Sequence, residues 1–288
     1  MRKKNSSTAF SLVEISLVLT IISVIIVGMI KSQALIGKAR LSNSQTLTKN
    51  SAVKDMNDVV AWYETSLETS FLFNEQKDGV QISVWQDGNA NAASRNNAEQ
   101  ASTINRPKFY TEVFNGSIPG IRFDGENDFM TFNGSQLIGN SYTIFVVEQR
   151  RANSNLLMFL GGTDSANNAN LNVGYASDAS IRHSHYGANT NDFTIPAFSS
   201  PKPAIHTFLF NKVAGQKYWQ NGGVSPEDSS GTFTTAISSF NGSAIGRYLG
   251  NYFHGDIAEI IIFNRALLTE ERQIIETYLS QKYGISIS

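Results

Sequence analysis

Alternating carboxylates are the residues of this chain most suited to hydrolytic chemistry. A retaining glycosidase holds a nucleophile and a general acid about 5–5.5 Å apart. The pattern Glu-x-Asp-x-x-Glu on one strand supplies such acids, because alternate side chains share a face of the sheet. Glu126 and Asp128 begin this pattern, but Thr131 stands where the last acid is needed. We therefore expect no glycosidase activity by this route and no catalytic residues.

The same stretch offers oxygen ligands to a metal ion. Asp124, Glu126 and Asp128 are candidate ligands for Ca²⁺, which prefers carboxylate and carbonyl oxygens. Gly125 and Asn127 lie between these acids and are typical of an ordinary turn. We favour the turn, keep Ca²⁺ as a weak candidate, and expect no other metal or cofactor.

Two further pairs have spacings that merit attention. His183 and His185 are two positions apart, so a strand would point both toward one face, but no nearby Cys or carboxylate completes a metal-binding set. We expect both histidines at the surface. Asp256 and Glu259 are three positions apart, so a regular strand would point them to opposite faces. We expect both acids to have structural roles in turn and sheet.

Exposed aromatic rings would be the natural basis for sugar binding. Tyr218 and Trp219 are adjacent candidates. A place in the core or in a hairpin is the favoured interpretation for both, and the ligand of the domain stays unknown at this stage.

Composition and charge exclude several classes of function. The 288 residues include 23 basic and 24 acidic side chains, for a formal charge of −1, and no long Lys/Arg block, so we expect no nucleic-acid partner. The chain has no Cys and hence no disulfide, thiolate zinc site or thiol nucleophile. Its 18 Phe, 10 Tyr and 22 Gly favour a β-rich fold with many turns.

The elements that must position these residues begin with an apolar run from Phe10 to Ile30, which contains a single charge, Glu14. As a helix the run measures ~31 Å and matches the ~30 Å hydrocarbon core of a bilayer. Arg2, Lys3 and Lys4 precede it and predict a cytoplasmic N-terminus. A carboxylate in hydrocarbon costs at least ~2.5 kcal/mol, so we expect Glu14 to find a partner.

The segment KNSSTA-FSLVEISLVLTII resembles the class III signal of type IV pilins and type II secretion pseudopilins. The resemblance implies that a prepilin peptidase cleaves between Ala9 and Phe10 and N-methylates Phe10. Ala9 stands where the family usually has Gly. The resemblance also implies that Glu14 pairs with the N-terminal amine of a neighbouring subunit in a filament. An uncleaved signal anchor, with Glu14 close to the wetted interface, is the alternative.

The chain divides into three segments. They are a leader peptide at 1–9, a pilin helix at 10–48 that is transmembrane over about 10–30, and a sandwich domain at 49–288. Ile30, Ala34, Gly37 and Leu41 recur at helical spacing, so the helix is expected to continue past the membrane and end near residue 48.

Beyond residue 58 the pattern changes to short strands separated by turn residues. The expected strands are Val80–Trp85, Gly120–Phe123, Tyr142–Glu148, Leu156–Leu160, Ile205–Asn211 and Ile257–Phe263. Residues 87–102 are expected to form a surface loop. A final helix is predicted from an N-cap at Thr269 to a stop at Gly284.

Residues 59–286 resemble a laminin-G/concanavalin A-like domain. The motifs that carry the resemblance are WYETS at Trp62, W-x-D at Trp85, RP at Arg106, IRFDGENDFM at Ile121, YWQNGG at Tyr218 and GDIAEIIIFNRALLTEERQIIETYLSQKYGI at Gly255. The resemblance implies an all-β jelly-roll sandwich of two antiparallel sheets. The expected fold is thus a long N-terminal transmembrane α-helix, this sandwich, and a C-terminal α-helix.

Together these features predict a pilin-like filament subunit that displays a lectin-like domain for adhesion or partner binding and is not an enzyme. The expected partners are prepilin peptidase, other pilin subunits, inner-membrane lipid and an extracellular glycan or protein. The resemblance places the precursor in a bacterial inner membrane with a periplasmic C-terminal domain, and the assembled protein in a surface pilus or periplasmic pseudopilus. A secretion pseudopilin and a membrane-anchored carbohydrate-active enzyme are the alternatives.

Overall fold

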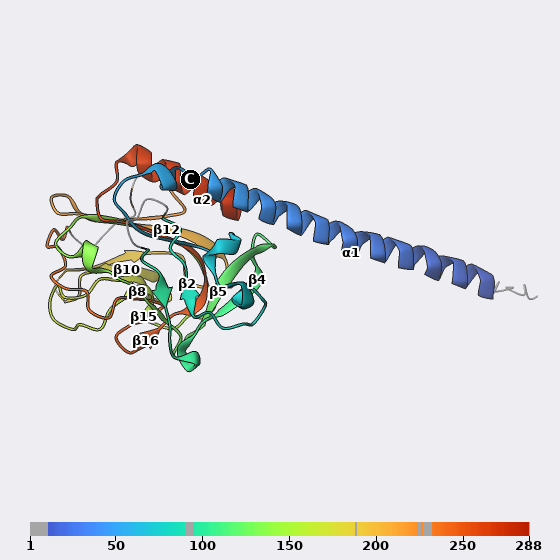
Figure 1. The fold of residues 1–288 in the computed structure, drawn as a ribbon, viewed down its shortest axis with the longest axis horizontal. Coiled ribbons are helices and arrows are strands. Elements are labelled where there is room, and N and C mark those ends of the chain that lie inside the picture. Colours follow the sequence, from blue (N-terminus) through green and yellow to red (C-terminus); the bar gives the residue numbers. More distant parts are fainter. Residues whose placement is uncertain (1–10, 90–94, 188, 224–225, 227–231, 288) are drawn as a thin grey trace, which may run out of the picture.

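A long helix extends from a β-sandwich in the computed structural model, which describes residues 11–89, 95–187, 189–223, 226 and 232–287. The helix α1 (Leu12–Lys49) projects away from the sandwich, and the C-terminal helix α2 (Thr269–Tyr283) lies beside its inner end (Figure 1). This architecture confirms the predicted fold class. The helix ends one residue beyond the predicted boundary.

Two antiparallel sheets form the sandwich in the described part of the chain. The first contains, in spatial order, β13 (Gly215–Gln220), β12 (Pro203–Asn211), β7 (Tyr142–Arg150), β17 (His254–Phe263), β5 (Ile118–Asp124) and β4 (Lys108–Phe114), with β1 (Val59–Glu64) paired to β17. The second contains β11 (Thr190–Thr194), β10 (Ser180–Ser184), β9 (Asn172–Ser177), β8 (Leu157–Gly161), β14 (Ala244–Ile245), β6 (Met130–Thr131), β3 (Ala98–Glu99) and β2 (Val84–Trp85). A small ribbon pairs β15 (Arg247–Tyr248) with β16 (Asn251–Tyr252).

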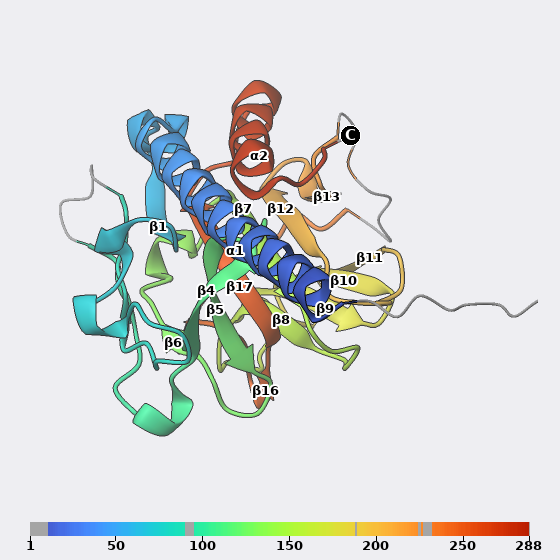
Figure 2. The same ribbon diagram turned by 90° about the vertical axis from the view of Figure 1, so that its right-hand side faces the viewer.

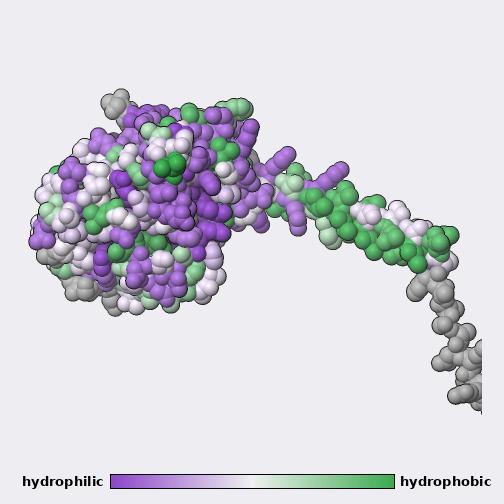
Figure 3. Space-filling model, turned by 90° about the horizontal axis from the view of Figure 1, so that it is seen from below, coloured by the Kyte–Doolittle hydropathy of each residue, from purple (hydrophilic) through white to green (hydrophobic). Residues whose placement is uncertain are grey.

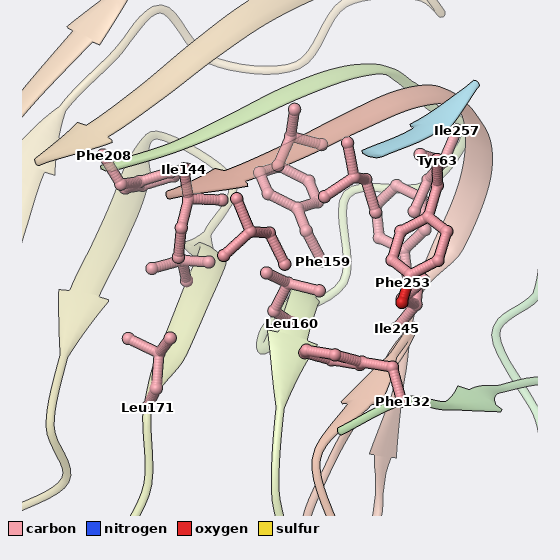
Figure 4. Packing of buried hydrophobic residues seen from close by; sticks show 14 of the residues in the cluster. Tyr63, Phe132, Ile144, Phe159, Leu160, Leu171, Phe208, Ile245, Phe253 and Ile257 are labelled. Atoms are coloured by element: carbon pink, nitrogen blue, oxygen red, sulfur yellow. The ribbon is translucent and has the colours of Figure 1, made fainter. Parts of the chain in front are cut away.

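Apolar side chains that alternate along the strands fill the space between the sheets. Ile144 and Phe208 point inward from the first sheet toward Phe159 of the second (Figure 4). The rings of Phe159 and Phe208 have centroids 6.3 Å apart. This core accounts for the runs that the sequence identifies as strands, because both sheets bury their inner faces against each other.

A second apolar cluster covers the outer face of the first sheet. Ile275 and Leu279, one turn apart on α2, pack there against residues of β17 that include Ile261 and Phe263. Helix α2 begins one residue earlier than predicted, since Leu268 rather than Thr269 is the N-cap. Its predicted stop is confirmed.

One face of α1 approaches the sandwich only over its last turns. Gly37, Leu41, Ser44 and Thr48 are among its partly or fully buried positions and recur at helical spacing. The view nearly along α1 shows the helix crossing the head with α2 next to it (Figure 2). The prediction of a continuous helix that leaves the membrane and reaches the head is consistent with this arrangement.

Residues 87–89 and 95–102, the described parts of the segment expected to be a surface loop, are only partly exposed. Asp87 and Ala98 are buried, and Ala98 belongs to β3. The carboxylate of Asp87 accepts a hydrogen bond from the backbone N–H of Trp62 at 2.9 Å, which ties the segment to β1. The strand predicted at Val80–Trp85 is shortened to Val84–Trp85.

Candidate functional site

The outer part of α1 is an exposed apolar rod. The large apolar side chains from Leu12 to Ile36 are 45–86% exposed. Figure 3 shows the rod in green beyond a predominantly polar head. Contiguous apolar surface of this kind marks a membrane or protein interaction site. In length and composition α1 qualifies to cross a membrane.

Glu14 lies in the first turn of this rod. Its Oε2 accepts a hydrogen bond from the backbone N–H of Ser11 at 2.8 Å, and the Ser11 hydroxyl accepts one from the Glu14 N–H at 3.2 Å. This capping box satisfies two N-terminal donors of the helix. Ala9 and Phe10, the predicted cleavage and methylation residues, lie outside the described part of the chain.

Polar contacts fix the inner end of α1 to the head. Arg40 Nη1 donates to the carbonyl of Asn115 at 3.0 Å, and Gln45 Nε2 donates to the carbonyl of Ser66 at 2.9 Å. The hydroxyl of Thr48 is hydrogen-bonded to that of Tyr278 on α2. A groove of about 900 Å³ remains between α1 and the head alongside these contacts.

A buried ammonium group lies directly beneath this junction. Lys282 of α2 donates to Glu64 on β1 at 3.1 Å and to Glu259 on β17 at 2.8 Å. Glu259 also accepts hydrogen bonds from Trp62 Nε1 at 2.6 Å and from the hydroxyl of Tyr283 at 2.8 Å. The cluster therefore joins β1, β17 and α2 under the point where α1 meets the head.

Hydrogen bonds and charge keep the buried carboxylate of Glu64 ionised. Burial, the largest influence on Glu64, raises its pKa, but the charge of Lys282 and the hydroxyls of Ser66 and Ser70 together hold that pKa below its usual value. Removing one member of such a cluster leaves an uncompensated buried charge. The sequence pattern did not predict the cluster, because its members lie far apart along the chain.

Asp256 and Glu259 lie on the same face of the first sheet, which corrects the expectation of opposite faces. A β-bulge between Ile257 and Glu259 inserts an extra residue and reverses the alternation. Asp256 forms ion pairs with Arg122 at 2.6 Å and with Arg151 at 3.1 Å. Both acids thus cross-link elements of the outer face, in line with the structural roles expected of them.

The acidic cluster at 124–128 forms a turn. Asp124 Oδ1 accepts hydrogen bonds from the backbone N–H groups of Glu126, Asn127 and Asp128 at 2.8–3.3 Å, and Asp128 Oδ2 accepts one from the N–H of Asp124 at 3.1 Å. Burial, followed by the charge of Asp124, raises the pKa of Asp128 to about 7. Within the described residues no group of three or more His, Asp or Glu side chains is arranged to hold a metal ion.

His183 and His185 are buried, so the expectation that they lie at the surface is wrong. They do face the same way, and both Nε2 atoms lie 2.7 Å from the hydroxyl oxygen of Tyr142. The carbonyl of Thr235 accepts from His185 Nδ1 at 2.6 Å, so Nε2 of that ring accepts from Tyr142 and the Tyr142 oxygen accepts from His183. The hydroxyl of Tyr142, which is hydrogen-bonded to both rings, allows their burial.

Tyr218 and Trp219 pack in the molecule as predicted. Tyr218 is fully buried in the core, and Trp219 is 6% exposed with the guanidinium of Arg272 4.1 Å from its ring centroid. Neither ring is presented to solvent as a platform for a sugar.

A second buried polar network lies between the sheets. The hydroxyl of Tyr175 donates to Glu148 Oε1 at 2.7 Å, and His206 Nε2 lies 2.9 Å from the same oxygen. Burial, followed by the charge of Glu148, raises the pKa of Tyr175. The sequence signal for this network is the alternation of Glu148 and Arg150 at the end of an otherwise apolar strand, which the sequence-based prediction did not use.

Comparisons with known proteins define the class of the head. Neither a protein-family model nor a curated protein matches the chain. Among solved structures, Trypanosoma rangeli sialidase matches 78% of the chain at 15% identity with a TM-score of 0.50, and its complex with 2,3-difluorosialic acid matches 88% at 14% identity with a TM-score of 0.52. The binding domain of botulinum neurotoxin serotype G matches 64% of the chain and 48% of its own length at 14% identity, with a TM-score of 0.43.

The head is therefore a β-sandwich that shares its fold with parts of these sialidase structures. The chain covers 33% and 39% of the two sialidase chains, and at this identity the likeness concerns the fold. The sequence-based prediction that the chain is not an enzyme is contradicted by the sialidase structures, which are enzymes and share its fold. Thr131, which stands where the third acid of the pattern is needed, excluded only that one arrangement of catalytic carboxylates. It carried no information about other arrangements.

Proposed function

We propose that this chain is a pilin-like subunit of a helical filament whose head is a carbohydrate-binding β-sandwich. One observation carries the proposal: the outer part of α1 is apolar and exposed, while the last turns of the same helix are fixed to the head by Arg40, Gln45 and Thr48. Packing such rods side by side would bury their apolar surface and leave the heads outside. The groove beside α1 leaves unfilled space where α1 meets the head.

Processing by prepilin peptidase would create the N-terminus of the mature subunit. The basic leader, Ala9, Phe10 and Glu14 support cleavage before Phe10 and its N-methylation. In the single chain Glu14 caps its own helix through Ser11. In a filament the carboxylate would exchange this contact for the N-terminal ammonium of a neighbour, a charge pair that relieves the burial cost of both groups.

The same features support a two-stage location. The precursor is held in a bacterial inner membrane by α1 with the head on the periplasmic side, as the basic residues before the span favour. After processing, the subunit leaves the bilayer for a filament. A surface adhesive pilus fits the bulky head, and a periplasmic pseudopilus of a type II secretion system is the alternative location.

Carbohydrate binding by the head is supported by the lectin-like sandwich that it shares with the sialidase structures. Because those proteins are enzymes, the assay for glycan binding should also measure glycan hydrolysis. Turnover of a glycan by the full chain would favour a membrane-anchored carbohydrate-active enzyme over an adhesive subunit.

The experiment that tests this proposal is mass spectrometry of the N-terminal peptide from cells that express the prepilin peptidase. The expected peptide begins with N-methylated Phe10. A mature protein that retains Met1 or Lys3 would contradict it. Shearing then distinguishes the two locations, since a surface pilin is released with the fibres and a pseudopilin stays with the cell envelope.

A further inference from the structure

A small pocket opens at the edge of the sandwich, where the segment between β11 and β12 passes over the end of β7. Its volume is about 290 Å³. This lies near the lower end of the ~300–1,000 Å³ range of ligand sites and suits a single small ring. Its lining combines two cations, Arg150 and Lys202, with aromatic rings and hydroxyl groups.

Arg150 is the unusual member of this lining. It is only 5% exposed, and its guanidinium donates to the carbonyl oxygens of Ser177 at 3.4 Å and Asp178 at 3.0 Å. The guanidinium carbon lies 4.0 Å from the ring centroid of Tyr175 and 4.9 Å from that of Phe198. In the described residues no carboxylate lies within ion-pair distance of Arg150, although a buried cation is normally paired.

Two acids of the surrounding elements each have one carboxylate oxygen engaged by other groups. Glu148 Oε1 accepts from Tyr175 and lies within hydrogen-bond distance of His206. Asp178 Oδ1 accepts from the backbone N–H of Phe198 at 3.0 Å. Arg150 is therefore held in place by carbonyls and rings, with its charge available to a ligand that enters the pocket.

We infer that this pocket binds a sugar ring that carries a carboxylate. Arg150 and Lys202 would receive the carboxylate, because a guanidinium fork matches its two oxygens and a lysine adds a second positive charge. Phe198 offers an apolar face to the ring, and Ser199 and Ser200 offer hydroxyls to the sugar hydroxyls. The inference rests on the carbohydrate-binding part of the proposed function and names the chemical class of its ligand.

Saturation-transfer NMR and calorimetry on the full chain in detergent micelles test this inference. The probes are glucuronic acid and N-acetylneuraminic acid, with glucose as the neutral comparison. We expect the acids to bind at least about tenfold more tightly than glucose, as charge-assisted hydrogen bonds require. Raising the salt concentration to about 0.5 M should weaken the binding of the acids and leave any glucose signal unchanged.

Two substitutions separate ligand recognition from folding. Lys202→Gln changes an exposed side chain and should weaken the binding of the acids about three- to tenfold. Arg150→Lys keeps the positive charge and removes the guanidinium fork, so affinity for the acids should fall by more than about tenfold. The near-ultraviolet circular dichroism spectrum should not change. Lys212→Gln, an exposed lysine on the β12–β13 turn and outside the pocket, is the matched control and should bind like the wild type.

Absence of acid binding by the wild type at about 10 mM, equal binding of glucose, or unchanged binding by both pocket variants would each overturn the inference. These results are independent of the filament proposal, since binding is measured on the isolated chain. Failure of N-terminal processing would contradict the filament proposal and leave the pocket result intact.

Discussion

Thr48 at the end of α1 and Tyr278 of α2 are hydrogen-bonded through hydroxyl oxygens 3.3 Å apart, although 230 positions separate them in the chain. Tyr278 also donates to Glu259 on β17 at 2.9 Å. The contact links the apolar rod, the C-terminal helix and the first sheet at one point. A load applied to α1 in a filament would pass into the head through this junction.

Tyr278→Phe should loosen the junction while leaving the sandwich folded. The change removes one hydroxyl that is hydrogen-bonded to both Thr48 and Glu259, so we expect the free energy of unfolding to fall by about 1–3 kcal/mol. Hydrogen exchange of residues 41–49 should accelerate, whereas exchange in β7 and β12 should not change. The exposed Thr277→Val on the same helix is the control, and equal protection of 41–49 in Tyr278→Phe and the wild type would refute the role of the contact.

Lys282→Met should be strongly destabilising. It leaves Glu64 and Glu259 buried without their shared cation, which costs about 3–5 kcal/mol in comparable cases. Urea unfolding of the full chain in detergent measures the loss. Lys77→Met, at an exposed position, should cost less than about 0.5 kcal/mol. Near-equal midpoints for the two variants would show that the buried cluster is dispensable.

Mild acid should destabilise the head through its buried histidines. Burial lowers the pKa of His185 to about 4, and burial followed by the charge of His185 lowers that of His183. Because the unfolded pKa is about 6.5, stability is complete above that pH and falls as the pH drops toward the folded pKa. At pH 5 the effect of His185 lowers the free energy of unfolding by about 2 kcal/mol.

Unfolding measured at pH 7.5, 6 and 5 checks this dependence. His185→Gln should reduce the slope between pH 6 and 5 by about one proton, or about 1.4 kcal/mol per pH unit. Asp128 holds its proton more tightly in the folded chain and adds stability as the pH falls over the same range, so the histidine dependence is measured in an Asp128→Asn background. In that background a stability that is constant or rises between pH 7.5 and 5 would be incompatible with the burial of neutral histidines.

Asp128→Asn should stabilise the head at alkaline pH. With a pKa of about 7, Asp128 holds its proton more tightly in the folded chain than in the unfolded chain, where the pKa is about 3.9. Its contribution is fully present below about pH 4 and is lost as the pH rises through about 7. The variant should therefore melt at a higher temperature than the wild type at pH 8, with the difference vanishing near pH 4.

Calcium provides a second measurement at the same turn. Backbone N–H groups donate hydrogen bonds to Asp124 Oδ1 and to Asp128 Oδ2 in the folded chain. We expect 1 mM-scale Ca²⁺, on the order of the weakest extracellular sites, to leave the melting temperature of the wild type unchanged. A Ca²⁺-dependent rise that Asp128→Asn abolishes would instead show that these acids bind the ion.

The sequence predicts the elements whose pattern is set by local physics. The end of α1 near residue 48, the strands of β7, β12 and β17, and the stop at Gly284 follow from periodicity and capping, and the structure agrees. β9, β10 and β11 escaped prediction because Asn, Ser and His interrupt their apolar alternation. The burial of His183 depends on a partner from another strand, because its Nε2 is hydrogen-bonded to the hydroxyl of Tyr142.

Site residues divide in the same way. Glu14 was identifiable because a charge in an apolar run is locally anomalous. The β-bulge before Glu259, the Lys282 cluster and the pocket at Arg150 depend on contacts between distant segments, which no single-sequence pattern records. The fold of the head therefore followed from the sequence more completely than its chemistry did.

Incorporation of Glu14→Ala into filaments tests the central claim most directly. The variant and a Ser16→Ala control are expressed with the prepilin peptidase, and the protein is quantified in membranes and in the sheared-fibre or pseudopilus fraction. We predict normal membrane levels for both variants, normal filament levels for Ser16→Ala, and loss of Glu14→Ala from the filament by at least about tenfold, as expected when a carboxylate–ammonium pair at a subunit contact is broken. Equal incorporation of Glu14→Ala and the wild type would contradict the account.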